Sequence, residues 1–130
     1  ENYIHSSSDS VNINHTQFSE NVAPESGGAM SYFSLGKEKI ISLQGSIFLK
    51  NRTSTEANVQ GLGGVLFIEN ADVMSPANLY IESCVFEENI AQLGGVIHSK
   101  HFDQKIYNSV FNQNYAENEG GVLFVSNNLY

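Results

Sequence analysis

The sequence predicts an all-β protein, a right-handed single-stranded parallel β-helix of about four coils with insertions at its corners. Two observations carry this prediction. A Phe-x-x-Asn motif followed by Gly-Gly recurs four times in 130 residues, and apolar and polar side chains alternate before each Phe. A helical solenoid is excluded, because no segment repeats apolar residues at helical spacing over the roughly ten residues that a helix requires.

The first element of each repeat is a strand upstream of the Phe. The segments "VNINHTQF", "ISLQGSIF", "LYIESCVF" and "QKIYNSVF" align without gaps. Seven residues before the Phe the column holds Val11, Ile41, Leu79 and, as an exception, Gln104. Five residues before the Phe it holds Ile13, Leu43, Ile81 and Ile106. Their neighbours are mostly polar, and this period of two indicates a strand with one buried face.

A bend and a second short strand follow. The side of the chain that carries apolar residues switches before each Phe, so we expect a bend near His15, Gly45, Ser83 and Asn108. The next column holds small residues, namely Thr16, Ser46, Cys84 and Ser109. As the only cysteine, Cys84 cannot form an internal disulfide, and we expect a buried thiol that packs like a slightly larger Ser.

The motif itself predicts two stacked columns. An interior aromatic stack would consist of Phe18, Phe48, Phe86 and Phe111. An amide ladder, in which each side chain donates to and accepts from neighbouring coils, would consist of Asn21, Asn51, Asn89 and Asn114. The chain is expected to turn through the Asn before it enters a third strand.

Paired glycines begin that third strand. They are Gly27 and Gly28, Gly63 and Gly64, Gly94 and Gly95, and Gly120 and Gly121. Such pairs suit a corner that needs positive φ or a close approach of two backbones, where a Cβ would not fit.

Three short strands joined by bends therefore describe one coil of a solenoid. Successive Phe residues lie 30, 38 and 25 apart, so insertions of different length are expected at the corners, above all in 52–62 and 69–78. Coils would stack at about 4.8 Å, and the general rule for parallel crossovers predicts a right-handed path. Residues 1–130 would form one β-helix segment without caps, part of a longer repeat protein or a filament subunit that stacks end to end on copies of itself.

The paired motifs resemble the Phe-x-x-Asn and Gly-Gly-Ala-Ile repeats of chlamydial polymorphic membrane proteins and similar surface β-helix proteins of protists. The resemblance covers roughly residues 11–125. This chain has "GGAM" once, "GGVL" twice and "GGVI" once. The resemblance implies a right-handed parallel β-helix displayed outside the cell, in an adhesion or surface-coat role.

Composition narrows the range of partners. The chain is 41% hydrophobic and 15% charged, which is typical of a folded domain. With a net charge of −8 and six scattered Lys and Arg residues, we expect no nucleic-acid partner and no binding to anionic membranes. No apolar run reaches the roughly 18 residues of a membrane span. The polar residues, rich in Ser, Asn and Gln, are more typical of secreted β-rich proteins.

Catalytic patterns are sparse. Parallel β-helices also include polysaccharide lyases and hydrolases, which need converging carboxylates from neighbouring coils together with Lys or Arg. The corner carboxylates that could form an acidic patch are Glu87, Glu88, Glu117 and Glu119. A solvated corner explains them more simply, so we expect no catalytic residues. Binding of glycan without cleavage would need exposed aromatics on one face, for which Tyr80 and Tyr107 are the weak candidates.

Metal and modification signals are equally limited. His98 and His101 lie three residues apart but lack a third ligand, so neither a metal nor a cofactor is expected. Asn14 and Asn51 both begin Asn-x-Thr sequons and are candidate glycosylation acceptors in a eukaryotic secretory pathway. A side chain committed to the inward ladder could not carry a glycan, and Asn14 is therefore the better acceptor.

Together these features predict a non-enzymatic, extracellular or cell-surface β-helix with a structural or adhesive role. It would be a rigid rod, able to assemble end to end into a fibril, with host or cell-surface glycans or proteins as further partners. The alternative is a carbohydrate-binding or polysaccharide-cleaving β-helix that uses its acidic corner residues.

Overall fold

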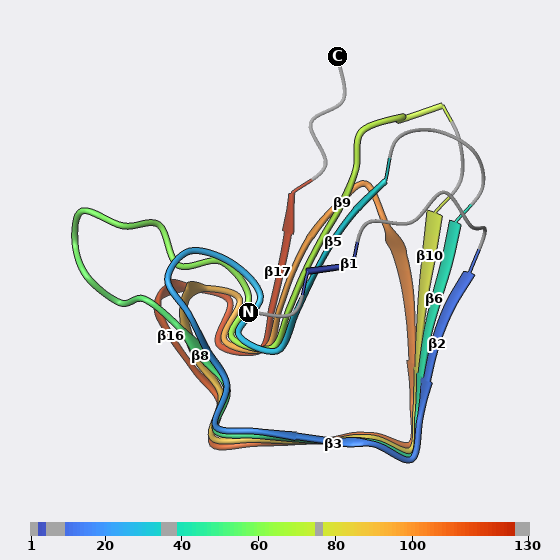
Figure 1. Cartoon of the computed structure of the whole chain (residues 1–130), viewed down its shortest axis with the longest axis horizontal. Helices are drawn as coiled ribbons and strands as arrows, with labels where there is room; N and C mark the ends of the chain where they lie inside the picture. The colour runs from blue at the N-terminus through green and yellow to red at the C-terminus, as the bar shows by residue number, and fades with distance from the viewer. Residues whose placement is uncertain (1–2, 5–9, 35–38, 75–76, 127–130) are drawn as a thin grey trace.

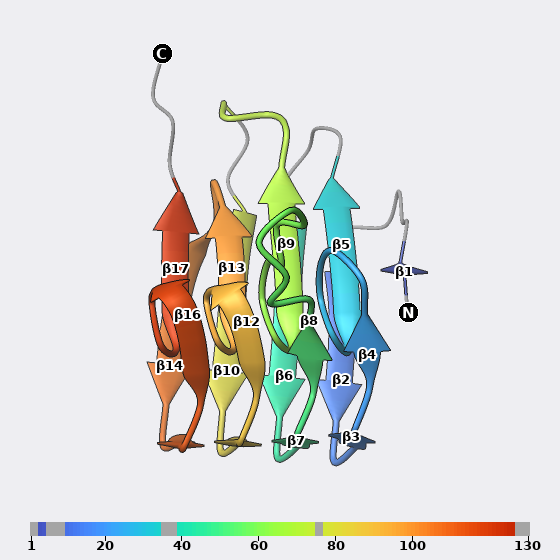
Figure 2. The same cartoon turned by 90° about the vertical axis from the view of Figure 1, so that its left-hand side faces the viewer.

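The protein is all-β, and its strands lie in four parallel sheets that run side by side along one axis. The computed structural model describes residues 3–4, 10–34, 39–74 and 77–126, which contain seventeen short strands. Viewed down the axis, successive coils superimpose in one angular outline (Figure 1). Seen from the side, the coils lie next to one another along one axis (Figure 2). No helix within the described residues is long and apolar enough to cross a membrane.

Each sheet takes one strand from every coil, and each is named here after its first complete strand. The β2 sheet has the order β14-β10-β6-β2 and consists of β2 (Ser10–Asn14), β6 (Lys39–Gln44), β10 (Ala77–Glu82) and β14 (Asp103–Tyr107). The β3 sheet consists of β3 (Gln17–Ser19), β7 (Ile47–Leu49), β11 (Val85–Glu87) and β15 (Val110–Asn112). The β4 sheet consists of β4 (Val22–Ala23), β8 (Arg52–Thr53), β12 (Ile90–Leu93) and β16 (Tyr115–Glu119). The β5 sheet consists of β5 (Met30–Ser34), β9 (Leu66–Asn70), β13 (Ile97–Lys100) and β17 (Leu123–Ser126), with β1 (Tyr3–Ile4) added at the β5 edge.

Parallel, in-register pairing between coils is what the recurring motif predicts. Phe86 pairs with Phe48 on one side and with Phe111 on the other, and Leu79 pairs with Ile41 and Gln104 in the same way. Because equivalent residues of adjacent coils face each other, every column of the sequence alignment becomes a row of side chains along the axis.

The phenylalanine rings stack nearly parallel at the centre of the β3 sheet. Their centroids lie 5.2, 4.8 and 4.8 Å apart, with interplanar angles of 4°, 5° and 3°. The two inner rings, Phe48 and Phe86, are almost completely buried, whereas the outer rings of the stack are partly exposed. The hydrophobic core lies between this stack and the inward residues of the β2 and β5 sheets, such as Leu43, Ile81 and Ile97.

The amide ladder saturates the asparagine side chains. Asn89 Oδ1 accepts hydrogen bonds from the backbone N and from Nδ2 of Asn51, at 2.9 and 3.1 Å. Asn89 Nδ2 donates to Phe48 O at 3.0 Å and to Asn114 Oδ1 at 2.9 Å. Asn51 and Asn89 are completely buried, and because their amides are fully bonded this burial carries little desolvation penalty.

Two kinds of glycine form the corner between the β4 and β5 sheets. The first glycine of each pair has φ between 58° and 68°, which favours glycine strongly. A Cβ on the second glycine would come within 2.0–2.2 Å of a carbonyl oxygen of the next coil in the first three pairs. The fourth, Gly121, lies on the outermost described coil, and the nearest atom to a Cβ there is Asn114 O of the same coil, 4.0 Å away.

The coil has four strands, and our expectation of three was wrong. The extra strand is the one after the ladder Asn, which forms the β4 sheet. Sequence comparison missed it because the segment between Asn and Gly-Gly varies in length and shares no apolar alternation. Its inward side chains are small, namely Ala23, Thr53 and Ala91, so it contributes little to the pattern of large apolar residues.

Candidate functional site

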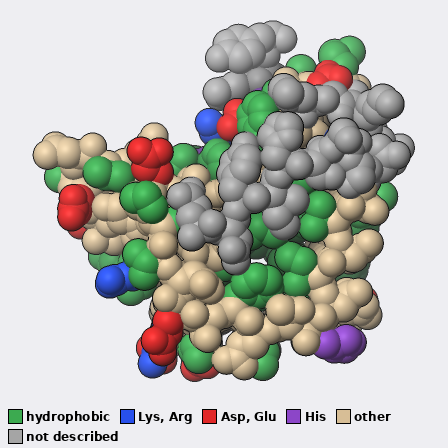
Figure 3. All heavy atoms as spheres, viewed as in Figure 1, with side chains coloured by type: hydrophobic (Ala, Val, Ile, Leu, Met, Phe, Trp, Pro, Cys, Tyr) green, Lys and Arg blue, Asp and Glu red, His purple; other side chains and the backbone are tan. Residues whose placement is uncertain are grey.

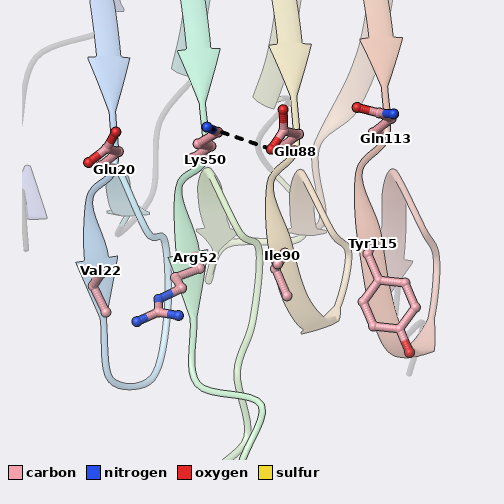
Figure 4. A pocket seen from close by; sticks show the side chains of 8 residues that line it. All are labelled: Glu20, Val22, Lys50, Arg52, Glu88, Ile90, Gln113 and Tyr115. Carbon is pink, nitrogen blue, oxygen red and sulfur yellow. Dashed lines mark ion pairs between the residues drawn. The ribbon is translucent and has the colours of Figure 1, made fainter.

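A groove runs along the outward face of the β4 sheet and crosses all four coils. It encloses about 630 Å³ and is lined by two rows of side chains. Figure 4 shows the rows, one at the turn that enters the sheet and one on its strands. The lining residues are Glu20, Val22, Lys50, Arg52, Glu88, Ile90, Gln113 and Tyr115.

The first row stands on the bend between the β3 and β4 sheets. Each coil has one residue there in the left-handed region, namely Glu20, Lys50, Glu88 and Gln113, with φ of 57°, 54°, 54° and 53°. The turn therefore lies one residue before the ladder Asn, not at the Asn as the motif suggested. The Asn side chains point inward to bond between coils, so the preceding side chains are exposed and adjacent.

Lys50 and Glu88 form an ion pair within this row. Lys50 Nζ lies 3.8 Å from Glu88 Oε2, and the two side chains are 50% and 45% exposed. A pair this open to water contributes little to stability. Both groups are therefore free to exchange this contact for a ligand.

The second row consists of the residue directly after each ladder Asn. Val22, Arg52, Ile90 and Tyr115 pair in register across β4, β8, β12 and β16. They point outward because the following residue in each strand faces the interior. Val22 and Tyr115 are both 56% exposed, so the groove has an apolar floor interrupted by a guanidinium group.

A long excursion between β8 and β9 lines a second hollow beside the groove. Its residues Ser54, Thr55, Glu56 and Val59 line a second hollow of about 440 Å³ that shares Val22, Arg52 and Ile90 with the first. The buried Gln92 of the next coil holds the excursion in place. Its Nε2 donates to Glu56 O, and its Oε1 accepts from Gly61 N at 3.3 Å. These hydrogen bonds attach the wall of the second hollow to the solenoid.

Charges of both signs balance in the two rows. Glu20 and Glu88 oppose Lys50 and Arg52, so these eight lining residues carry no net formal charge, in a chain of net charge −8. Figure 3 shows red and blue side chains together at the lower left, where Figure 1 places the β4 sheet.

The four predicted corner carboxylates do not gather at one site. Only Glu88 lines the groove. The side chain of Glu87 accepts a hydrogen bond from Asn112 Nδ2 at 3.1 Å, and Glu117 and Glu119 are exposed residues of β16. Among the described residues, no group of three or more His, Cys, Asp and Glu side chains is arranged to hold a metal ion.

His98 lies in an aromatic column on the outward side of the β5 sheet. Its ring is 3% exposed, with centroids 5.4 Å from Phe67 and 4.9 Å from Phe124. Neither ring nitrogen has a hydrogen-bond partner. Burial, with a smaller contribution from the charge of Lys100, lowers the pKa of His98 to about 4, so the ring is neutral at pH 7. The nearby His101, for which no metal role was expected, lies at a left-handed bend after β13.

The column of small residues is a second hydrogen-bonded ladder, which we did not anticipate. Ser46 Oγ accepts from Thr16 N and donates to Gln44 O, both at 3.1 Å. Cys84 is buried, its Sγ donates to Glu82 O at 3.4 Å, and burial raises the pKa of its thiol. The signal was present in the sequence, since Ser and Thr directly after a bend often bond to nearby backbone.

The two sequons differ in accessibility. Asn51 is fully buried, and its Nδ2 donates to Phe18 O and to Asn89 Oδ1, so the folded coil leaves no room for a glycan there. Asn14 is exposed at the end of β2. Both candidate tyrosines lie in the β2 sheet and not at the groove. Tyr107 is exposed, and Tyr80 pairs with Lys105, whose Nζ lies 5.4 Å from the centre of its ring.

The fold and the groove define the described part of the chain as an all-β protein of the solenoid type, built from stacked parallel coils. No protein-family model, curated protein or solved structure matches this chain.

Proposed function

We propose that this chain is a non-enzymatic, extracellular structural or adhesive β-helix. The support comes mainly from how the recurring residues are used. Phe, Asn and Gly-Gly recur in every coil. In the inner coils the Phe rings stack, the Asn side chains form hydrogen bonds between coils, and the glycines allow close backbone contacts. A repeat that maintains stacking and leaves its lateral surface to vary suits a rod that presents surfaces to partners.

The right-handed path belongs to the same proposal. It rests on the general handedness of parallel crossovers and on the resemblance to the polymorphic membrane protein repeats. An experimental structure at a resolution that traces the backbone tests it, and a left-handed coil would refute both the rule as applied here and the family resemblance.

Growth along the axis follows from the edges of the sheets. Within the described residues, β14, β15, β16 and β17 are each paired on one side only. Such edges accept another parallel coil, from the same polypeptide or from a second copy. Electron microscopy and sedimentation over a range of concentrations test the second case. Rods that lengthen with concentration support it, whereas particles of constant length at all concentrations count against a filament.

Cleavage of a polysaccharide is the second candidate function, favoured by the presence of Glu20 and Glu88 with Lys50 and Arg52 in one groove. A catalytic acid usually sits in a water-poor site, whereas the Glu88 side chain is 45% exposed. Release of reducing ends from polysaccharides, abolished by Glu88→Gln, would establish this alternative and overturn the non-enzymatic proposal.

An extracellular route through a eukaryotic secretory pathway has its own test. Peptide mass measurement on protein secreted from eukaryotic cells should find a glycan on Asn14 and none on Asn51. An unmodified Asn14 in such material would remove the support that this sequon gives to the glycoprotein assignment.

A further inference from the structure

We propose that the groove on the β4 sheet binds a neutral, extended polysaccharide along the solenoid axis without cleaving it. The proposal rests on the adhesive form of the proposed function and adds the chemical class of the partner and the residues that contact it.

The geometry of the groove selects a linear polymer. Val22, Arg52, Ile90 and Tyr115 each come from a different coil, so the floor advances by about 4.8 Å per residue and spans about 14 Å. It crosses the strands instead of following one of them (Figure 4). A pyranose unit in an extended chain advances by a length close to one coil spacing. Successive sugars would therefore lie over successive coils.

The side chains offer what a sugar ring needs. Tyr115 is 56% exposed and presents a rigid, amphipathic ring against which the apolar face of a pyranose can stack. Val22 and Ile90 continue the apolar floor. Above the floor, Glu20, Glu88 and Gln113 supply acceptors and an amide donor for hydroxyl groups.

The electrostatics favour a neutral chain over an acidic one. Glu20 and Glu88 share the groove lining with the cations Lys50 and Arg52. Glu56 adds a third carboxylate in the adjoining hollow. A uronate or nucleic-acid polymer would carry its negative charges past all three carboxylates in a chain of net charge −8. A neutral polyol avoids this repulsion and uses charges of both signs as hydrogen-bonding groups.

An extended peptide fits less well, because the floor is the face of a sheet and not its edge. The central strands β8 and β12 are paired on both sides. A ligand lying on this face meets side chains and not an open strand edge, so a peptide could not add as a further strand there.

Calorimetric titration of the whole chain with cello-oligosaccharides and manno-oligosaccharides of one to six units tests the proposal, with hexagalacturonate as the acidic comparison. Binding should strengthen up to about four units, since four coils line the groove, and then level off. Tyr115→Ala should weaken hexasaccharide binding at least about tenfold. The matched control is Tyr107→Ala, which removes a tyrosine of similar exposure, 53%, from the β2 sheet and should leave binding unchanged.

Three outcomes would overturn the proposal. They are no binding of either neutral hexasaccharide at millimolar concentration, equal losses from the two tyrosine variants, and tighter binding of hexagalacturonate. Thermal unfolding of both variants establishes that each is folded. Failure here would leave the rod proposal intact, because particle shape and lengthening are measured separately. Cleavage of the oligosaccharides would instead refute both proposals.

Discussion

Replacement of His98 by Phe should remove a pH-dependent decrease in the free energy of unfolding. The ring lies between Phe67 and Phe124, and its two nitrogens have no partner in the folded chain. A phenyl ring would continue the aromatic column and remove both polar atoms. Its slightly larger size adds a constant energy term that does not depend on pH.

The magnitude follows from the shifted pKa. The pKa of His98 is about 4 in the folded chain, below the ordinary 6.5 expected when the chain unfolds. Between these values the unfolded chain binds a proton that the folded chain does not, so stability falls as pH falls. The slope is about 1.4 kcal/mol per pH unit, and the full effect of His98 is about 3 kcal/mol. Above pH 6.5 the ring is neutral in both states and this loss of stability is absent, and it is complete only below about pH 4.

Urea unfolding followed by circular dichroism, from about pH 7.5 to about pH 4.5, measures this effect. As the pH falls across this range, the free energy of unfolding of the parent should decrease by about 2–3 kcal/mol more than that of His98→Phe. His15→Asn is the matched control, because it removes an exposed histidine from a left-handed position that Asn tolerates. An equal difference between parent and His98→Phe at both ends of the range would refute the reasoning.

Three further predictions test the ladders by urea unfolding. Asn89→Ala breaks four hydrogen bonds, three of them buried, and should cost on the order of 3–5 kcal/mol. Exposed Asn112→Ala should cost well under about 1 kcal/mol, and similar losses from the two variants would contradict the ladder. Gly64→Ala places a Cβ 2.2 Å from a backbone oxygen of the next coil and should cost at least about 2 kcal/mol. Gly121→Ala should cost little, because the nearest atom to its Cβ is a backbone oxygen of its own coil at 4.0 Å. Cys84→Ser should change the free energy of unfolding by less than about 1 kcal/mol, because Ser occupies the same column elsewhere; a larger loss would mean that sulfur packing matters more than the hydrogen bond.

The interior of the coil was predictable from sequence because the same side chains recur in the same columns. The bend expected near His15, Gly45, Ser83 and Asn108 is confirmed, since all four adopt positive φ. The parallel registers of the Phe column and the strand columns also follow the alignment. Because coils stack in register, a residue that recurs at the same place in each repeat contacts its equivalents in the adjacent coils.

The lateral surface was not predictable in the same way. Val22, Arg52, Ile90 and Tyr115 share no chemistry, and they come together only because each follows a ladder Asn. The corner carboxylates were grouped by sequence proximity. Glu87 and Glu88 nevertheless have different surroundings, because Glu87 ends β11 and Glu88 is the left-handed residue of the bend that follows. A surface that differs from coil to coil carries no repeating signal.

Unequal coil lengths give the solenoid a mechanical signature. The ladder asparagines lie 30, 38 and 25 residues apart, although they occupy neighbouring rungs. A force applied to the two ends of the chain would peel coils away one at a time, and each would release slack in proportion to its length, roughly 3.5 Å per residue. The second coil, with its long excursion, would yield the largest of the three steps. Because each step length identifies its coil, the force-extension trace would record the order in which the coils detach.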